Sequence, residues 1–138
     1  MARTLAGDHA LAHLDLDTIA WRARAVRADL AVSVAALDRF MDEHDSWVIE
    51  GCYGDLIERA AARCTEMRFL NPGVEACLRN NDRRPWEPHK YESAAAQDRH
   101  FEFLQAWVRD YAQRDDEFSL ARHQAIFDAF PGPKRMDT

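Results

Sequence analysis

The chain has 138 residues, of which 47% are hydrophobic, and a formal net charge of −6 at pH 7. This apolar content excludes a disordered protein and suffices for one buried core, so we expect a single domain over residues 1–138. The acidic balance argues against a protein that holds nucleic acid mainly through its phosphates. The chain has no apolar run near the ~20 residues that cross a bilayer and no N-terminal signal core, so we expect a soluble, cytoplasmic protein with no membrane partner.

The first predicted elements are the end of a helix, a strand and a long helix. Residues 3–6 read as a last helical turn, which Gly7 ends. The apolar run over residues 11–14 predicts a strand that ends in an acidic turn, Asp15-Leu16-Asp17. The long helix is predicted over residues 24–44, because apolar side chains recur there at steps of three and four: Val26, Leu30, Val34, Leu37 and Met41.

Two more strands are predicted, each followed by a helix. Residues 47–49 are rich in strand formers and lead into Glu50-Gly51, and a helix starts at Gly54 with Asp55 as its N-cap. The next strand covers residues 67–70, and a helix follows from Val74 to about Arg79.

The C-terminal half is predicted to be mainly helical. Residues 80–92 hold two prolines and read as a loop or flap, residues 93–113 and 119–130 as helices, and residues 135–136 as an edge strand. Short apolar strands that alternate with amphipathic helices are typical of a parallel sheet in an α/β fold.

The three cysteines, at positions 52, 64 and 77, are widely spaced and form no C-x-x-C pair. This spacing predicts free thiols in a reducing compartment, because zinc sites need closely paired ligands.

Acidic side chains follow two of the predicted strands. Asp15 and Asp17 follow the first strand and Glu50 the second, and ligands of α/β sheets bind at the carboxyl ends of strands. Clustered carboxylates there suit Mg²⁺ or a hydroxyl group that must be held and deprotonated. The alternative is structural: Asp15 or Asp17 caps the next helix and Glu50 is only a polar strand end.

A second candidate site is the arginine-rich stretch from Arg79 to Trp86. Its guanidinium groups suit phosphate oxygens, and a proline-containing flap at about residues 79–92 could close as a lid over a phosphoryl group. The alternative is a solvated helix end, which the helix dipole favours for basic residues.

Together the stretches "ARTLA", "HLDLDTIAW", "WVIEGCYGDLIERAAARCTEMRFLNP", "CLRNNDRR" and "HQAIFDAFPGPK" resemble small P-loop kinase-like ATPases. They look like the adenylate/shikimate kinase-like group often labelled DNA topology modulation proteins. The resemblance implies a P-loop NTPase fold with three α/β/α layers and a short parallel sheet. It also implies ATP and Mg²⁺ as cofactors and phosphoryl transfer from ATP to the hydroxyl of a small molecule.

The family's phosphate-binding loop, G-x-x-x-x-G-K-[ST], is not found in the 138 residues. By the resemblance, residues 2–17 are the back half of a phosphate-binding unit, and we expect an N-terminally truncated form. Either Met1 is misplaced, or the chain is a natural short form that has lost nucleotide binding. The family's missing first strand would leave its neighbours unpaired, or pairing with each other or with a second chain as a homodimer.

The resemblance also assigns roles by position. Asp15 and Asp17 match the acidic pair that holds the phosphoryl acceptor or its Mg²⁺, and no residue matches the nucleotide-binding loop. The substrate-binding strand end is matched by Glu50, Gly51 and Tyr53, although Cys52 stands where asparagine is common. The lid arginines are matched by Arg79, Arg83 and Arg84.

Two functions follow as hypotheses. The first is an ATP-binding small-molecule kinase or ATPase, inactive in this form because the loop is absent. The second is a non-catalytic binding or scaffold protein that keeps the fold.

Overall fold

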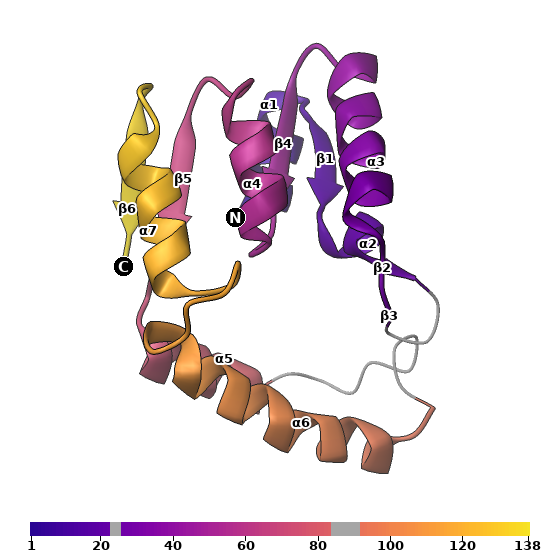
Figure 1. Ribbon diagram of the computed structural model, residues 1–138, viewed down its shortest axis with the longest axis vertical. Coiled ribbons are helices and arrows are strands. Elements are labelled where there is room, and N and C mark those ends of the chain that lie inside the picture. Colours follow the sequence, from indigo (N-terminus) through magenta and orange to yellow (C-terminus); the bar gives the residue numbers. More distant parts are fainter. Residues whose placement is uncertain (23–25, 84–91) are drawn as a thin grey trace. The chain divides into compact units, whose positions relative to one another are not determined.

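The structure, a computed structural model, describes residues 1–22, 26–83 and 92–138 (Figure 1). These residues form two compact units, Met1–Thr65 and Glu66–Thr138. Each unit contains a pair of parallel strands flanked by helices, so the chain is an α/β protein as predicted.

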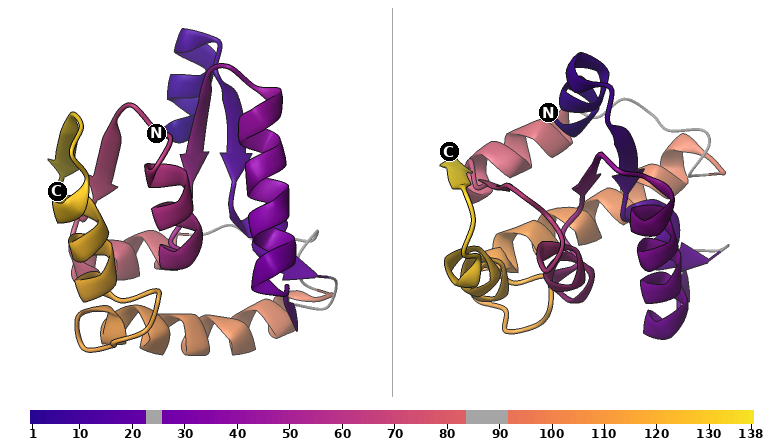
Figure 2. Two further views of the ribbon diagram at one scale, coloured as in Figure 1. Left: turned by 45° about the horizontal axis from the view of Figure 1, so that its top comes forward. Right: turned by 90° about the horizontal axis from the view of Figure 1, so that it is seen from above.

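The first unit is built on strands β1 and β4, which pair in parallel with Asp15 opposite Glu50. Seen from above, α1 lies on one side of this pair, and α3 and α4 lie on the other (Figure 2). A short antiparallel pair, β2 and β3, follows α2. The elements are α1 (Ala2–His9), β1 (Ala12–Asp15), α2 (Asp17–Ala20), β2 (Trp21–Arg22), β3 (Val26–Arg27), α3 (Leu30–Glu43), β4 (Trp47–Glu50) and α4 (Gly54–Ala61).

The core of the first unit is formed mainly by leucine side chains from β1, the start of α2, α3 and α4. Leu16, Leu37 and Leu56 are fully buried, and Leu14 and Met41 are nearly so. Outside this core, α3 and α4 are joined by the paired bonds between Arg59 and Asp38, both of 2.9 Å.

The second unit is built on β5 and β6, a parallel pair in which Leu70 lies opposite Asp137. Helix α7 contacts β5, where the rings of Phe69 and Phe127 lie 5.8 Å apart, and α5 packs against α6. The elements are β5 (Met67–Leu70), α5 (Val74–Asp82), α6 (Ala94–Arg109), the 3-10 helix η2 (Asp110–Ala112), α7 (Leu120–Ala129) and β6 (Lys134–Asp137).

Side-chain caps set the starts of three helices. Asp29 accepts a hydrogen bond from the backbone of Ala31 at the start of α3, and Ser93 and Ser119 cap α6 and α7 in the same way. Such caps satisfy backbone N–H groups that have no partner within the helix.

The predicted start of the long helix, at residue 24, is wrong. Helix α3 begins at Leu30, behind the Asp29 cap, and Val26 belongs to the short strand β3. Residue 24 lies outside the described residues. The spacing between Val26 and Leu30 fits a helix, but Val26 and Arg22 pair in the antiparallel β2–β3 ladder instead.

Three other predicted boundaries are also wrong. Helix α1 runs past Gly7 to His9 and ends where Ala10 takes a left-handed conformation with φ 54°. Tyr53, not Asp55, takes the N-cap position of α4. Helix α5 continues to Asp82, so residues 80–82 are helical rather than part of a flap, and residues 84–91 of that flap lie outside the described residues.

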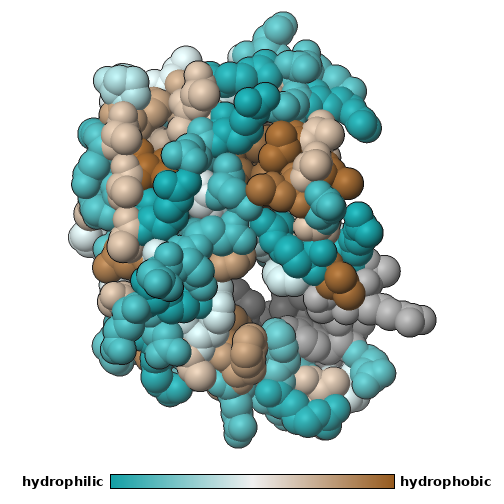
Figure 3. Space-filling view, viewed as in Figure 1, coloured by the Kyte–Doolittle hydropathy of each residue, from teal (hydrophilic) through white to brown (hydrophobic). Residues whose placement is uncertain are grey.

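The strands predicted at residues 47–49, 67–70 and 135–136 are confirmed within one residue at each end. The cysteines at positions 52, 64 and 77 form no disulfide in the described part of the chain, and each is partly exposed. The face in Figure 3 is largely hydrophilic with separate apolar areas. In the described part of the chain, no helix is both long and apolar enough to span a bilayer.

Candidate functional site

The carboxyl ends of β1 and β4 lie side by side in the first unit. Their parallel register places Asp15 opposite Glu50, and the backbone N–H of Leu16 donates to the Glu50 carbonyl at 2.9 Å. The acidic turn after β1 and the Glu50-Gly51 segment after β4 therefore share one edge of the strand pair, where α/β proteins bind ligands.

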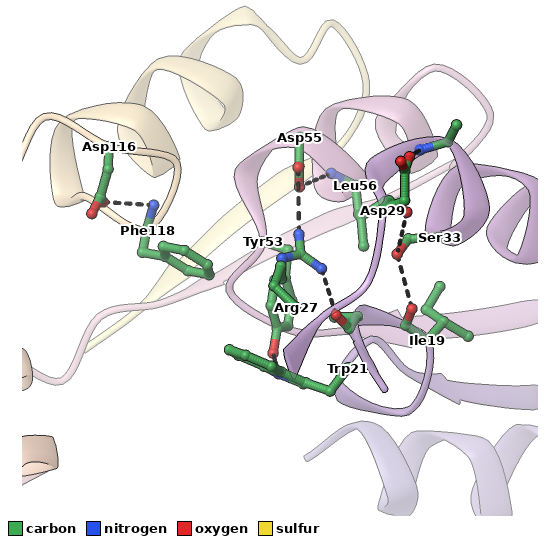
Figure 4. Close-up of polar contacts among 12 residues, drawn as sticks. Ile19, Trp21, Arg27, Asp29, Ser33, Tyr53, Asp55, Leu56, Asp116 and Phe118 are labelled. Carbon is green, nitrogen blue, oxygen red and sulfur yellow. Dashed lines mark hydrogen bonds and ion pairs between the residues drawn. The ribbon is translucent and has the colours of Figure 1, made fainter. Parts of the chain in front are cut away.

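Asp17, Tyr53 and Trp21 form a hydrogen-bonded chain at this edge, which we call the Asp17–Tyr53 cluster. The Tyr53 hydroxyl donates to Oδ1 of Asp17 at 2.5 Å, and the Trp21 indole N–H donates to the Tyr53 oxygen, also at 2.5 Å. Figure 4 shows the Tyr53 hydroxyl directed at the Trp21 ring. The cluster thus joins the start of α2, its end and the segment after β4.

Tyr53 is a buried, neutral hydrogen-bond donor. Tyr53 is only 3% exposed to solvent. Burial, together with the hydrogen bond to the Asp17 carboxylate, raises the pKa of the Tyr53 phenol well above its usual range. The phenol therefore keeps its proton at neutral pH and holds one oxygen of Asp17 in place.

Asp17 keeps a second carboxylate oxygen for other contacts. The residue is exposed, and its Oδ2 makes no hydrogen bond to the described residues. A carboxylate that is held through one oxygen and open through the other can accept a proton or a hydroxyl hydrogen bond.

Asp15 shapes the turn that leads into α2. Its Oδ1 accepts from the backbone N–H of Asp17 at 3.0 Å, and its carbonyl accepts from the Thr18 hydroxyl at 2.6 Å. Asp15 thus bonds to the backbone ahead of α2, but Leu16 takes the N-cap position and no described side chain caps this helix. Asp17 is the first residue of α2, so neither aspartate is the cap that the structural alternative describes.

Glu50 and Gly51 contact the neighbouring strand. The His13 Nε2 and the Glu50 Oε1 lie 2.7 Å apart, with their side chains 22% and 41% exposed. Gly51 has φ +157°, and a Cβ at this position would lie 2.8 Å from the Cβ of Leu16. The close approach that this glycine permits is therefore to the Leu16 side chain.

For Mg²⁺, the donor set at this edge consists of two carboxylates. Mg²⁺ is commonly bound by one or two carboxylates together with waters and phosphate oxygens, and Asp15 and Asp17 are the aspartates at this edge. In the described part of the chain, no three side chains of histidine, cysteine, aspartate or glutamate form a metal-binding group.

The predicted lid arginines belong to the second unit or lie outside the described residues. Arg79 is in the last turn of α5, Arg83 follows its end, and both are exposed. Arg84 lies outside the described residues. Arg79 and Arg83 therefore lie at a solvated helix end, which is the alternative to a lid in the sequence analysis.

Sequence reasoning missed Arg27 and His13. Arg27 lies within the range that was predicted to be helical, so no pattern linked it to Tyr53. The guanidinium carbon of Arg27 lies 4.6 Å from the centre of the Tyr53 ring. His13 gave no signal of its own; it pairs with Val48, and its side chain reaches Glu50, two residues further along β4.

Comparison with protein-family models, with curated proteins and with solved structures found no match to this chain.

Proposed function

We propose that this chain carries the acceptor-binding side of a small P-loop kinase-like phosphotransferase or ATPase with α/β/α layers. The observation that supports this best is the Asp17–Tyr53 cluster, which fixes one carboxylate at the shared end of two parallel strands. It joins the two motifs that carry the resemblance, D-L-D-x-x-x-W and W-V-I-E-G-x-Y.

In this proposal Asp17 is the base. Tyr53 holds Oδ1, and the exposed Oδ2 accepts the proton of a hydroxyl on a small-molecule substrate. Glu50 and Gly51 border the same edge and line the substrate side, with Glu50 held by His13. When bound, Mg-ATP supplies the phosphoryl group and neutralises its charge. In the alternative role, Asp15 and Asp17 are the carboxylates that would hold the metal in place of the hydroxyl.

The phosphate-binding loop is the missing requirement, because its backbone N–H groups and lysine supply most of the phosphate cradle. The 138 residues contain no such sequence. We therefore expect no ATP binding by these residues alone, and turnover only when a strand and a G-x-x-x-x-G-K-[ST] loop precede residue 1.

The test compares the chain of 138 residues with a form extended at its N-terminus by that strand and loop. Calorimetry measures Mg-ATP binding, and ADP formation is measured with and without shikimate, glucose or a nucleoside monophosphate as acceptor. Asp17→Asn in the extended form should lower kcat by roughly 10²–10⁴-fold, whereas Asp8→Asn, at an exposed position on α1, should not. An extended form that binds no Mg-ATP, or equal kcat in both variants, refutes the proposal.

The second candidate is a non-catalytic scaffold, which the outer edge of β4 favours. Ala12 and Leu16 donate to the carbonyls of Ser46 and Glu50. Because backbone groups alternate along a strand, Trp47 and Ile49 direct theirs away from β1. Among the described residues β1 is the one strand that pairs with β4. A scaffold would cover this edge with a second copy of the chain, so a monomer by light scattering that hydrolyses ATP would exclude this candidate.

A further inference from the structure

Arg27 joins three parts of the first unit around Tyr53. Its guanidinium lies 4.6 Å from the centre of the Tyr53 ring, and its Nη1 donates to the carbonyl of Ala20, the last residue of α2, at 3.0 Å. Its Nη2 lies 3.4 Å from Oδ2 of Asp55, in the first turn of α4. Figure 4 shows the guanidinium lying between Asp55 and the Tyr53–Trp21 pair.

The contacts of Arg27 depend on the planar shape of its guanidinium. A flat cation can stack on an aromatic ring and donate hydrogen bonds from its edge in two directions at once, which the compact ammonium of lysine does not reproduce. The Ala20 carbonyl also accepts from the backbone N–H of Ala28, at 2.9 Å, so the segment that carries Arg27 is held against the end of α2.

We propose that Arg27 is a positioning residue, which presses the Tyr53 ring against the end of α2 so that the Tyr53 hydroxyl keeps Asp17 in its productive orientation. Trp21, the residue after α2, holds the same hydroxyl from the other direction. Arg27 does not touch the substrate in this scheme; it acts through Tyr53, and its hydrogen bonds to Ala20 and Asp55 hold it in place. Its effect on catalysis rests on the proposed function, whereas its effect on Tyr53 does not.

The experiment follows the indole N–H of Trp21 by NMR, because this group donates directly to the Tyr53 oxygen. Tyr53→Phe removes the acceptor and defines the signal of a released indole. We expect Arg27→Gln to move the resonance toward that released position and to speed its hydrogen exchange by roughly tenfold, as for one weakened hydrogen bond. Arg59→Gln is the matched control, since it breaks another arginine–aspartate pair of the same unit and should leave the Trp21 signal unchanged.

A second variant separates positioning of Tyr53 from simple attachment of α4. Asp55→Asn removes the ion pair but leaves the stacking on Tyr53 and the bond to Ala20, so its effect on the Trp21 signal should be clearly smaller than that of Arg27→Gln. An unchanged signal in Arg27→Gln, or an equal change in Asp55→Asn, overturns the proposal. If Arg27→Gln does not fold, Arg27→Lys decides: it keeps the charge and should still release the indole, and a native Trp21 signal in this variant overturns the role of the planar group.

The catalytic consequence is measured on the form extended by the phosphate-binding loop. There Arg27→Gln should lower kcat by roughly tenfold to a hundredfold and leave the KM for ATP unchanged. If the extended form has no turnover at all, the proposed function fails, while the NMR result still decides whether Arg27 positions Tyr53.

Discussion

Replacing Gly51 by alanine should destabilise the first unit, because the position has neither the space nor the backbone conformation for a side chain. A Cβ would lie 2.8 Å from the Cβ of Leu16 and 3.0 Å from its Cδ1. Leu16 is fully buried. A change of side-chain rotamer could move the Cδ1 but not the Cβ, which is fixed to the backbone, so the conflict can be relieved only by moving the strand ends apart.

The magnitude has two parts. Backbone strain at φ +157°, a region that L residues rarely adopt, costs about 1–3 kcal/mol. Overpacking against a buried side chain costs about 1–3 kcal/mol more. We expect the free energy of unfolding to fall by roughly 2–6 kcal/mol, which lowers a urea midpoint by about 1 M or more at an m-value of about 2 kcal/mol/M.

The assay is urea unfolding followed by circular dichroism, with Gly7→Ala as the control. Gly7 lies within helix α1, and a Cβ there would meet nothing within 4 Å. Alanine should therefore stabilise that helix by about 0.5–1 kcal/mol. The two substitutions are chemically identical and should act in opposite directions. A Gly51→Ala midpoint equal to that of the wild type would refute the steric reasoning.

Three further predictions concern single polar contacts. Tyr53→Phe should lower the free energy of unfolding in urea by about 1–2 kcal/mol. Because folding raises the pKa of Tyr53, the stability that this phenol contributes is complete below its pKa in the unfolded chain, near 10, and is lost as the pH rises further. Ser119→Ala removes the cap that accepts from Arg122 at the start of α7 and should lower the thermal stability by about 1 kcal/mol. Arg59→Gln should lower the urea midpoint at pH 7 but not at acid pH. The hydrogen bond from Arg59 lowers the pKa of Asp38. The stability that this ion pair contributes is therefore present above the pKa of the aspartate in the unfolded chain, near 3.9, and is lost as the pH falls.

The strands could be predicted because their signals are local. Residues 47–49 are apolar strand formers that lead into Glu50-Gly51, and residues 67–70 are apolar except for Arg68 and are followed by asparagine and proline. Runs this short are too short for a helix, and reading them needs no information from the rest of the chain. The structure places β4 and β5 at these runs.

The start of α3 could not be predicted in the same way, because a distant contact decides it. Val26 and Leu30 are four residues apart and fit the apolar stripe of one helix. Arg27, between them, contacts Ala20 and Tyr53, and the segment pairs with β2. Sequence periodicity describes one face of a helix and carries no information on such tertiary contacts.

The site was predictable to the level of the strand ends but not to that of its hydrogen bonds. Parallel pairing of two strands is enough to bring Asp15 near Glu50. The sequence did not indicate that Tyr53 would donate to Asp17, since a residue after a strand can point to either side of the sheet. It also left open whether Asp15 binds a ligand or caps the next helix, and the structure places Leu16 at the cap while Asp15 accepts from the Asp17 backbone.

Gly51 and Tyr53 connect the packing of this edge to its chemistry. The missing side chain at position 51 lets Leu16 pack directly against the segment that follows β4. Leu16 precedes Asp17, so this packing fixes the distance over which the Tyr53 hydroxyl must reach the carboxylate. A substitution that separates the strand ends at Gly51 should therefore also release Asp17 from Tyr53. The energetic effects of Gly51→Ala and Tyr53→Phe should then be less than additive, because the first variant already weakens the bond that the second removes.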